Sequence, residues 1–183
     1  MALADKIRTQ HIDNIMQTLA AKPHRKRIVN LNDIGSIGLI VQRLNATPDI
    51  ANESDKDRIT ISQFNTMLKK RGILLRIIEH PASQEMTDKF GLPRPDYLLS
   101  FTKYHYDMLI DATTDDGLFG PYVTLSTSSN LRVGYINNVT GDKPYSQIYD
   151  LLIIGKEPLD LATYLPNILH YITQIKKKKK INK

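Results

Sequence analysis

The sequence has no cysteine and no long apolar run, and each absence excludes a class of protein. With no cysteine among its 183 residues, the chain can form no disulfide, no thiolate metal site and no cysteine nucleophile. No apolar run approaches the ~18 residues of a membrane-spanning helix. The charged N-terminus, MALADKIRTQHIDNIM, also lacks the uninterrupted apolar stretch of a signal peptide. We therefore expect a cytoplasmic protein, since a reducing compartment suits a chain without disulfides.

The net charge of +6 is concentrated in two short segments. Residues 176–183 carry six lysines, so the other residues sum to zero, and the segment KPHRKR at 22–27 leaves residues 28–175 at −4. General nucleic-acid binding by the folded body is therefore disfavoured. A basic contact patch for a membrane surface or a nucleic acid would consist of Lys22, Arg25, Lys26, Arg27, Lys176, Lys177, Lys178, Lys179 and Lys180. The favoured alternative is a helix docked on its own domain, followed at the other end by a solubilising tail.

The first half of the chain predicts a helix and then a βαβ unit. Apolar residues recur at mostly helical spacing over 3–20, before Pro23. A near-continuous apolar strand is expected at 36–42, because a strand covered on both faces has this composition. A helix should start at a capping box at Ser54 and end before Gly72, with a second strand at 73–80.

The second half continues the alternation of strands and helices. The stretch PDYLLSF (95–101) fits either one helical turn or a short edge strand. The other expected elements are a strand at 106–112, a helix at 118–130, and strands at 132–137 and 149–155. A helix should run from Pro158 to 175, where Pro166 should cause a kink or divide it into two abutting helices.

This pattern predicts an α/β fold, namely a three-layer α/β/α sandwich of Rossmann-like or flavodoxin-like type on a mostly parallel five-stranded sheet. The strand order is left open between 2-1-3-4-5 and 3-2-1-4-5. We expect residues 1–27 to form the N-terminal amphipathic helix and a basic linker, residues 28–175 a single domain, and residues 176–183 a disordered polylysine tail.

Ligands of such sheets bind beyond the carboxyl ends of the strands, where Asp111, Asp115, Asp116 and His80 are the candidate ligand-binding residues. Converging carboxylates can hold Mg²⁺ with a phosphate substrate. The favoured alternative is that Asp115 and Asp116 form a turn and stabilise the positive end of the following helix. His80 is a lone histidine, which is more often solvated or structural. We assign no metal, cofactor or catalytic residue.

Two sequence signatures are missing, namely a dinucleotide-binding glycine turn and a nucleophile elbow. Gly35 precedes the first predicted strand and Gly38 lies inside it, whereas a dinucleotide-binding turn needs its glycines after the strand. The serines and threonines of TLSTSSN (124–130) fall late in a predicted helix and not at a nucleophile elbow, so we expect them to serve packing and helix capping.

The motifs VNLNDIGSIGLIV, YDMLIDAT, TLSTSSNLRVGY and IYDLLI resemble, in this order, an uncharacterised family of small bacterial α/β proteins, a domain of unknown function. That resemblance implies the fold but no activity. The unit from YDMLIDAT to LSTSSNLRVGY also looks like part of the N-terminal Rossmann-like half of heptosyltransferase-type glycosyltransferases. No catalytic residue of those enzymes matches a position here.

The leading hypothesis is a cytoplasmic protein that acts by binding or assembly without catalysis, with its N-terminal helix covering the sheet or a second copy. The alternatives are a sugar-nucleotide or other small-molecule binder that uses Asp111, Asp115, Asp116 and His80, and a protein that associates with anionic membranes or nucleic acid through its basic segments.

Overall fold

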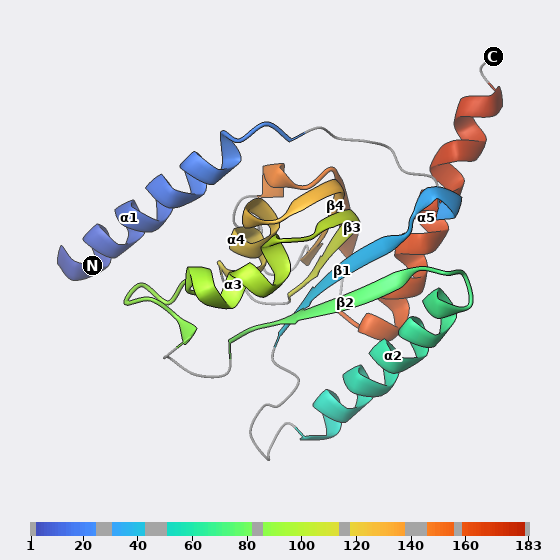
Figure 1. Ribbon diagram of the computed structural model, residues 1–183, viewed down its shortest axis with the longest axis horizontal. Coiled ribbons are helices and arrows are strands. Elements are labelled where there is room, and N and C mark those ends of the chain that lie inside the picture. Colours follow the sequence, from blue (N-terminus) through green and yellow to red (C-terminus); the bar gives the residue numbers. More distant parts are fainter. Residues whose placement is uncertain are drawn as a thin grey trace.

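The computed structural model describes residues 3–24, 31–42, 51–81, 86–113, 118–137, 146–155 and 159–181. Five parallel strands form one sheet with helices on both faces, which confirms the predicted α/β/α architecture (Figure 1). No helix in this part of the chain is long and apolar enough to cross a membrane.

The sheet has the order β2-β1-β3-β4-β5. Its members are β1 (Ser36–Val41), β2 (Leu74–Glu79), β3 (His105–Ala112), β4 (Ser128–Asn137) and β5 (Leu151–Gly155). Of the two orders that the sequence left open, this is the flavodoxin-like one, in which the direction of winding reverses between β1 and β3. The near-continuous apolar stretches of β1 and β3 fit their central positions, where helices cover both faces.

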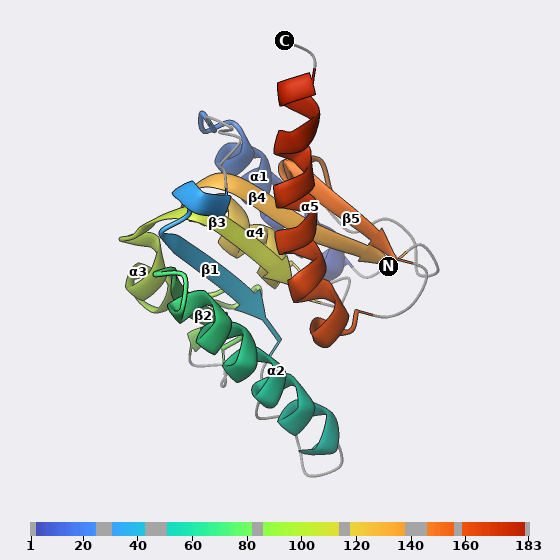
Figure 2. The same cartoon turned by 90° about the vertical axis from the view of Figure 1, so that its right-hand side faces the viewer.

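Two pairs of helices cover the two faces of the sheet (Figure 2). Helices α2 (Ala51–Lys69) and α5 (Leu161–Ile181) bury Phe64, Leu68, Leu165 and Ile168 against one face. Helices α3 (Pro95–Thr102) and α4 (Phe119–Ser126) cover the other face with a smaller apolar cluster. Each fully buried side chain of this size contributes roughly 1.5–3 kcal/mol, so these two clusters hold the layers together.

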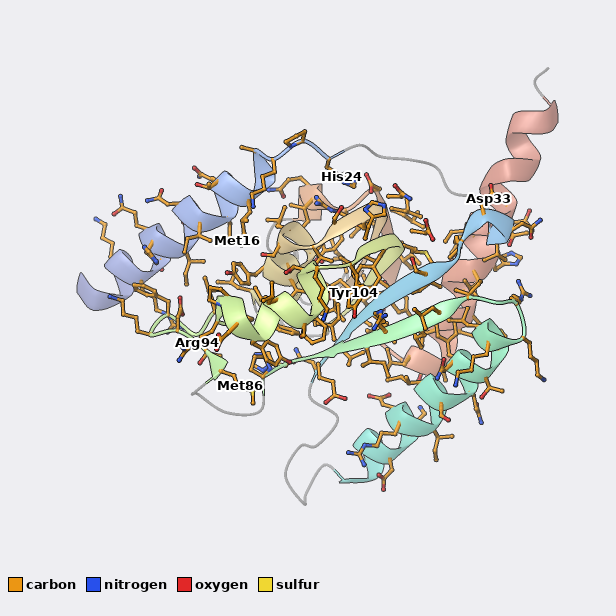
Figure 3. All side chains as sticks on the ribbon, viewed as in Figure 1. Met16, His24, Asp33, Met86, Arg94 and Tyr104 are labelled. Atoms are coloured by element: carbon orange, nitrogen blue, oxygen red, sulfur yellow. The ribbon has the colours of Figure 1, made fainter. Side chains whose placement is uncertain are left out.

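Helix α1 (Leu3–Ala20) packs mainly against α4. Its residues Ile12 and Met16, one helical turn apart, are buried with Leu125 of α4 and with the short turn η4 (Ser146–Ile148). Met16 lies on the inner side of α1 (Figure 3). The apolar stripe of α1 is thus used within the chain, and a second copy would have to contact the exposed side of this helix.

The end of α2 forms a Schellman motif around Gly72. The amide of Ile73 donates to the carbonyl of Leu68 at 3.0 Å, and the amide of Gly72 donates to Lys69 at 3.0 Å. Gly72 has φ of +72°, which glycine adopts without strain. The predicted stop is therefore confirmed. The predicted start is wrong, since α2 begins at Ala51 and Ser54 lies inside it.

The predicted helix over 118–130 is too long. Helix α4 ends at Ser126, Thr127 has an extended backbone, and β4 begins at Ser128. Ser128 and Ser129 pair with the first residues of β3. Serine and threonine are weak helix formers, and pairing with a central strand outweighs the continuation of the helix. The expected helix-capping position is thus held by Thr127 and not by Ser128 or Ser129, while the burial of Thr124, Thr127 and Ser129 agrees with the expected packing role.

The remaining differences concern helix ends. The stretch PDYLLSF forms α3, whose Pro95 occupies the first turn, where a missing amide costs no hydrogen bond. Helix α5 runs without a break from Leu161 to Ile181. Pro166 lies inside it and does not divide it into two helices. The helix therefore runs past residue 175 as helical backbone, and its far end projects beyond the sheet (Figure 2). The expectation of a disordered tail stays a prediction.

Candidate functional site

At the carboxyl end of β3, the carboxylate of Asp111 is buried and bonded within the protein. One carboxylate oxygen accepts a hydrogen bond from the amide of Thr113 at 2.9 Å and another from its hydroxyl at 2.7 Å. The hydroxyl of Tyr149 donates to the other oxygen. Asp111 therefore joins β3 to the segment before β5.

The first turn of α4 lies against this carboxylate because residue 120 is a glycine. A Cβ atom at Gly120 would overlap both oxygens of Asp111 and the hydroxyl of Thr113. An anion at a helix N-terminus is stabilised by the partial positive charge of the helix end, typically by about 0.3–1 kcal/mol. This arrangement explains a buried aspartate without any ligand, and it supports a structural role for Asp111.

Two buried tyrosines complete the Asp111 network. Burial raises the pKa of Tyr149 well above its ordinary value of 10.0, and the nearby Asp111 carboxylate raises it further. Burial and the same carboxylate raise the pKa of Tyr164, whose hydroxyl donates to the Asp111 carbonyl at 3.3 Å. Both hydroxyls stay protonated at neutral pH, as their role as donors requires.

The structure places the other predicted site residues only in part. His80 is half-buried, with its ring centroid 4.7 Å from that of Phe119, the first residue of α4. It therefore flanks the same helix turn as Asp111. Asp115 and Asp116 lie outside the described residues, so their predicted roles stay predictions. In the part of the chain that is described, no group of three His, Asp or Glu side chains is arranged to hold a metal ion.

The predicted basic contact patch is described only at its edges. Lys22 is exposed at the end of α1. The side chains of Lys176–Lys180 and the residues Arg25, Lys26 and Arg27 lie outside the described part, although the backbone of α5 is helical through the lysines. The patch therefore stays a prediction.

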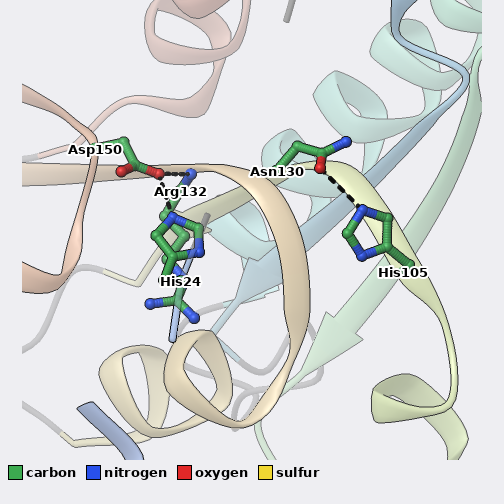
Figure 4. Close-up of polar contacts among 5 residues, drawn as sticks. All are labelled: His24, His105, Asn130, Arg132 and Asp150. Carbon is green, nitrogen blue, oxygen red and sulfur yellow. Dashed lines mark hydrogen bonds and ion pairs between the residues drawn. The ribbon is translucent and has the colours of Figure 1, made fainter. Parts of the chain in front are cut away.

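At the opposite, amino end of the sheet, polar side chains connect the first residues of β1, β3 and β4. Asp107 accepts hydrogen bonds from the amides of Gly35 and Ser36 and from the side-chain amide of Asn130. The side-chain oxygen Oδ1 of Asn130 lies 3.1 Å from Nε2 of His105 (Figure 4). Nδ1 of His105 lies 2.7 Å from the hydroxyl of Ser128, its partner in the sheet register.

A second polar contact at this end holds the segment after α1. Nε2 of His24 lies 2.8 Å from Asp150, and the same carboxylate oxygen accepts the amide of Arg132 at 2.8 Å (Figure 4). Burial lowers the pKa of the Arg132 guanidinium, and the Asp150 carboxylate opposes that shift. These contacts fix α1 and β5 to β4.

A groove of about 380 Å³ lies at the carboxyl ends of β4 and β5, beside the first turns of α5. Its walls combine apolar and aromatic residues with polar ones, and the former include Ile153, Ile154, Tyr135, Tyr164 and Tyr171. The side chains of Ile154 and Tyr171 are 63% and 48% exposed, and both lie in this wall. We call this feature the β5–α5 groove.

Gly155 shapes the floor of the groove. A Cβ atom there would overlap the hydroxyl of Tyr135, so glycine lets the tyrosine lie over the end of β5. The ring of Tyr135 packs edge-on against Tyr164 with centroids 5.4 Å apart. Through Tyr164 the groove is connected to the Asp111 network.

The polar side of the groove is the start of α5, where Asp160, Thr163 and Asn167 line it. Asp160 caps the helix, since its carboxylate accepts the backbone amide of Ala162 and its carbonyl accepts the amide of Tyr164 at 2.9 Å. The carboxylate also accepts the hydroxyl of Thr163 at 2.8 Å. Nζ of Lys56 lies 3.1 Å from the other carboxylate oxygen. The hydrogen bonds from Thr163 and Lys56 lower the pKa of Asp160, which is therefore an anion at neutral pH.

Sequence reasoning placed ligands at the carboxyl ends of strands but missed the residues of this groove. Tyr135 and Ile154 sit inside apolar strands, and nothing in their spacing separates them from core residues. The one usable signal was Asp160, three residues before Thr163 and directly before the apolar helix, which is a typical helix cap.

Neither the curated proteins nor the solved structures include a match to this chain. The likeness to heptosyltransferase-type enzymes therefore gains no support from them. A family model, described as a family of unknown function (DUF6913), matches residues 8–175. That match begins within helix α1, ends within helix α5 and covers most of the chain. The chain therefore belongs to this family.

Proposed function

We propose that this protein acts by binding, without catalysis, and that it takes its ligand in the β5–α5 groove. The observation that carries the proposal is the groove itself. Its volume of about 380 Å³ is within the range of small-molecule sites, roughly 300–1,000 Å³, which combine apolar walls with a few polar groups. It lies beyond the carboxyl ends of β4 and β5, at the same edge of the sheet as the reversal between β1 and β3 but displaced from that usual ligand position.

The chemistry of the groove favours binding over catalysis. No histidine is among its described lining residues. Its one hydroxyl–carboxylate pair, Thr163 with Asp160, is occupied in capping α5. A good general base has a pKa near the working pH, whereas hydrogen bonds from Thr163 and Lys56 lower the pKa of Asp160 and make its carboxylate a weak base.

The two alternative functions have less support. A sugar-nucleotide site would use Asp111, whose oxygens are bonded to Thr113 and Tyr149. Association with membranes or nucleic acid would use the basic segments. Replacing Lys176–Lys180 with glutamine would then abolish binding to anionic vesicles or RNA at low salt, whereas unchanged binding would exclude these lysines as the contact.

The test is a fragment screen by NMR on the ¹⁵N-labelled full chain, with sugar nucleotides plus Mg²⁺ included. Binders should shift the amide resonances of Gly155, Thr163 and Tyr171. The variant Asn167→Trp places a large side chain at the exposed rim and should abolish these shifts. Gln174→Trp, at another exposed position of α5, is the control and should leave them unchanged.

Two results would contradict the proposal. One is a set of binders that shift Thr113, Phe119 and His80 instead, which would favour the sugar-nucleotide alternative. The other is binding that survives in Asn167→Trp.

A further inference from the structure

The aromatic and acidic lining of the β5–α5 groove defines the charge of its ligand. Its described lining residues include one aspartate and three tyrosines, of which Tyr171 is 48% exposed. Tyrosine rings attract a cation placed over their faces. We propose that the groove binds an organic cation, that is, an alkylammonium or guanidinium group. This inference rests on the function proposed above.

Asp160 supplies the negative charge. Its side chain is 41% exposed and lines the groove, so a bound cation can approach it. The amide of Asn167 also lines the groove and offers a carbonyl oxygen as a second acceptor. The aromatic walls supply the apolar surface that an ammonium group with methyl or methylene substituents requires.

Lys56 is a built-in competitor for the same carboxylate. It comes from α2, its side chain is 63% exposed, and it contacts the Asp160 oxygen that does not accept from Thr163. An exposed ion pair of this kind is worth about 0–1 kcal/mol. A ligand cation can therefore displace it, and removal of Lys56 should strengthen binding.

An anion is disfavoured by the same features. The start of a long helix attracts anions through its free amides, but here Asp160 caps that end of α5. A phosphate in the groove would therefore face this carboxylate.

The experiment compares a cation with a neutral molecule of the same shape. The ¹⁵N-labelled full chain is titrated with choline and with 3,3-dimethylbutan-1-ol, which has a carbon in place of the nitrogen. Choline should shift Gly155, Thr163 and Asn167 in a saturable way. The neutral alcohol should bind about fivefold more weakly, as expected for the loss of ~1 kcal/mol.

Two charge variants and a control sharpen the result. Asp160→Asn keeps a good helix cap and should weaken choline binding about fivefold, with no change for the alcohol. Lys56→Gln should strengthen choline binding about two- to threefold. Asp96→Asn removes an equal charge from an aspartate that pairs with Arg94 on α3, and it should change neither titration.

The outcomes separate this inference from the proposed function. Equal binding of choline and the alcohol, or a response to inorganic phosphate at the same residues, would overturn the inference and leave a binding groove in place. If no tested ligand class binds saturably to the groove, both the inference and the proposed function are overturned.

Discussion

The two ends of the parallel sheet satisfy their polar groups in different ways. At the amino end, Asp107 of β3 collects hydrogen bonds from the start of β1 and from β4 in a part-buried setting, and His105 extends the network to the surface. At the carboxyl end, Asp111 is completely buried beneath α4 and accepts from Thr113 and Tyr149. The difference is access to water, which can replace a lost partner at the first site but not at the second.

This contrast also locates the groove. The carboxyl end is sealed over β3 by α4 but stays open over β5, where Ile154 and Tyr171 are exposed. Tyr164 connects the two parts, since it donates to Asp111 and lines the groove. The buried network thus lies directly beside the open groove.

The largest expected effect is that of Asp111→Ala. This change removes a buried acceptor and leaves the hydroxyls of Tyr149 and Thr113 without it, so we expect a loss of about 3 kcal/mol in the free energy of unfolding. Urea denaturation followed by circular dichroism measures it. Asp96→Ala, at an exposed aspartate, is the control and should cost less than about 0.5 kcal/mol. A loss for Asp111→Ala as small as that would show that water reaches the carboxyl end.

The second prediction uses the raised pKa values of Tyr149 and Tyr164. Below pH 10 both tyrosines are protonated in the folded and unfolded states, so they give no pH dependence. Above pH 10 they ionise in the unfolded chain but stay protonated in the fold, and stability falls as pH rises. Each contributes up to about 1.4 kcal/mol per pH unit.

Urea denaturation at pH 9, 10 and 11 measures this fall in the free energy of unfolding. Tyr149→Phe should make the fall shallower, because only Tyr164 of the two then contributes to the slope. The control is Tyr104→Phe, whose half-buried ring lies under Arg76. An equal slope in the parent chain and in Tyr149→Phe would contradict the burial of that hydroxyl.

The architecture was predictable because it depends on composition over several residues at a time. The apolar stretches of β1 and β3 and the turn at Gly72 each carry a strong local signal. The boundary between α4 and β4 could not be predicted from the sequence. Thr127 and Ser128 have only weak preferences for helix or strand, and the pairing of β4 with β3 decides their conformation. Local propensity gives way to tertiary pairing at such positions.

The sites were predictable only where one residue carries the signal. Asp111 was found because a charged residue ends an apolar strand, but its role depends on Gly120 and Tyr149, which are distant in the sequence. The groove depends on Gly155 and Tyr135 meeting across two strands. No spacing rule connects these pairs, since the fold alone brings them together.

The third prediction concerns the amino end. Asp107→Ala removes the acceptor of two backbone amides at the start of β1 and of the Asn130 side chain. Because the site is part-buried, water can replace some of these bonds, and we expect a loss of about 1–2 kcal/mol. The measurement is the same urea titration. A loss equal to that of Asp111→Ala would remove the distinction between the two ends.

The smallest effect is expected for His105→Ala. His105 is exposed and bonds to Ser128 and Asn130, both of which water can reach at the end of the sheet. We expect a loss of no more than about 0.5 kcal/mol. His24→Ala is the matched variant, because His24 is half-buried and contacts Asp150, which also holds the amide of Arg132. His24→Ala should lower the free energy of unfolding by more than His105→Ala and should increase amide exchange in α1. An equal loss for both variants would mean that the His24 contact does not hold α1 in place.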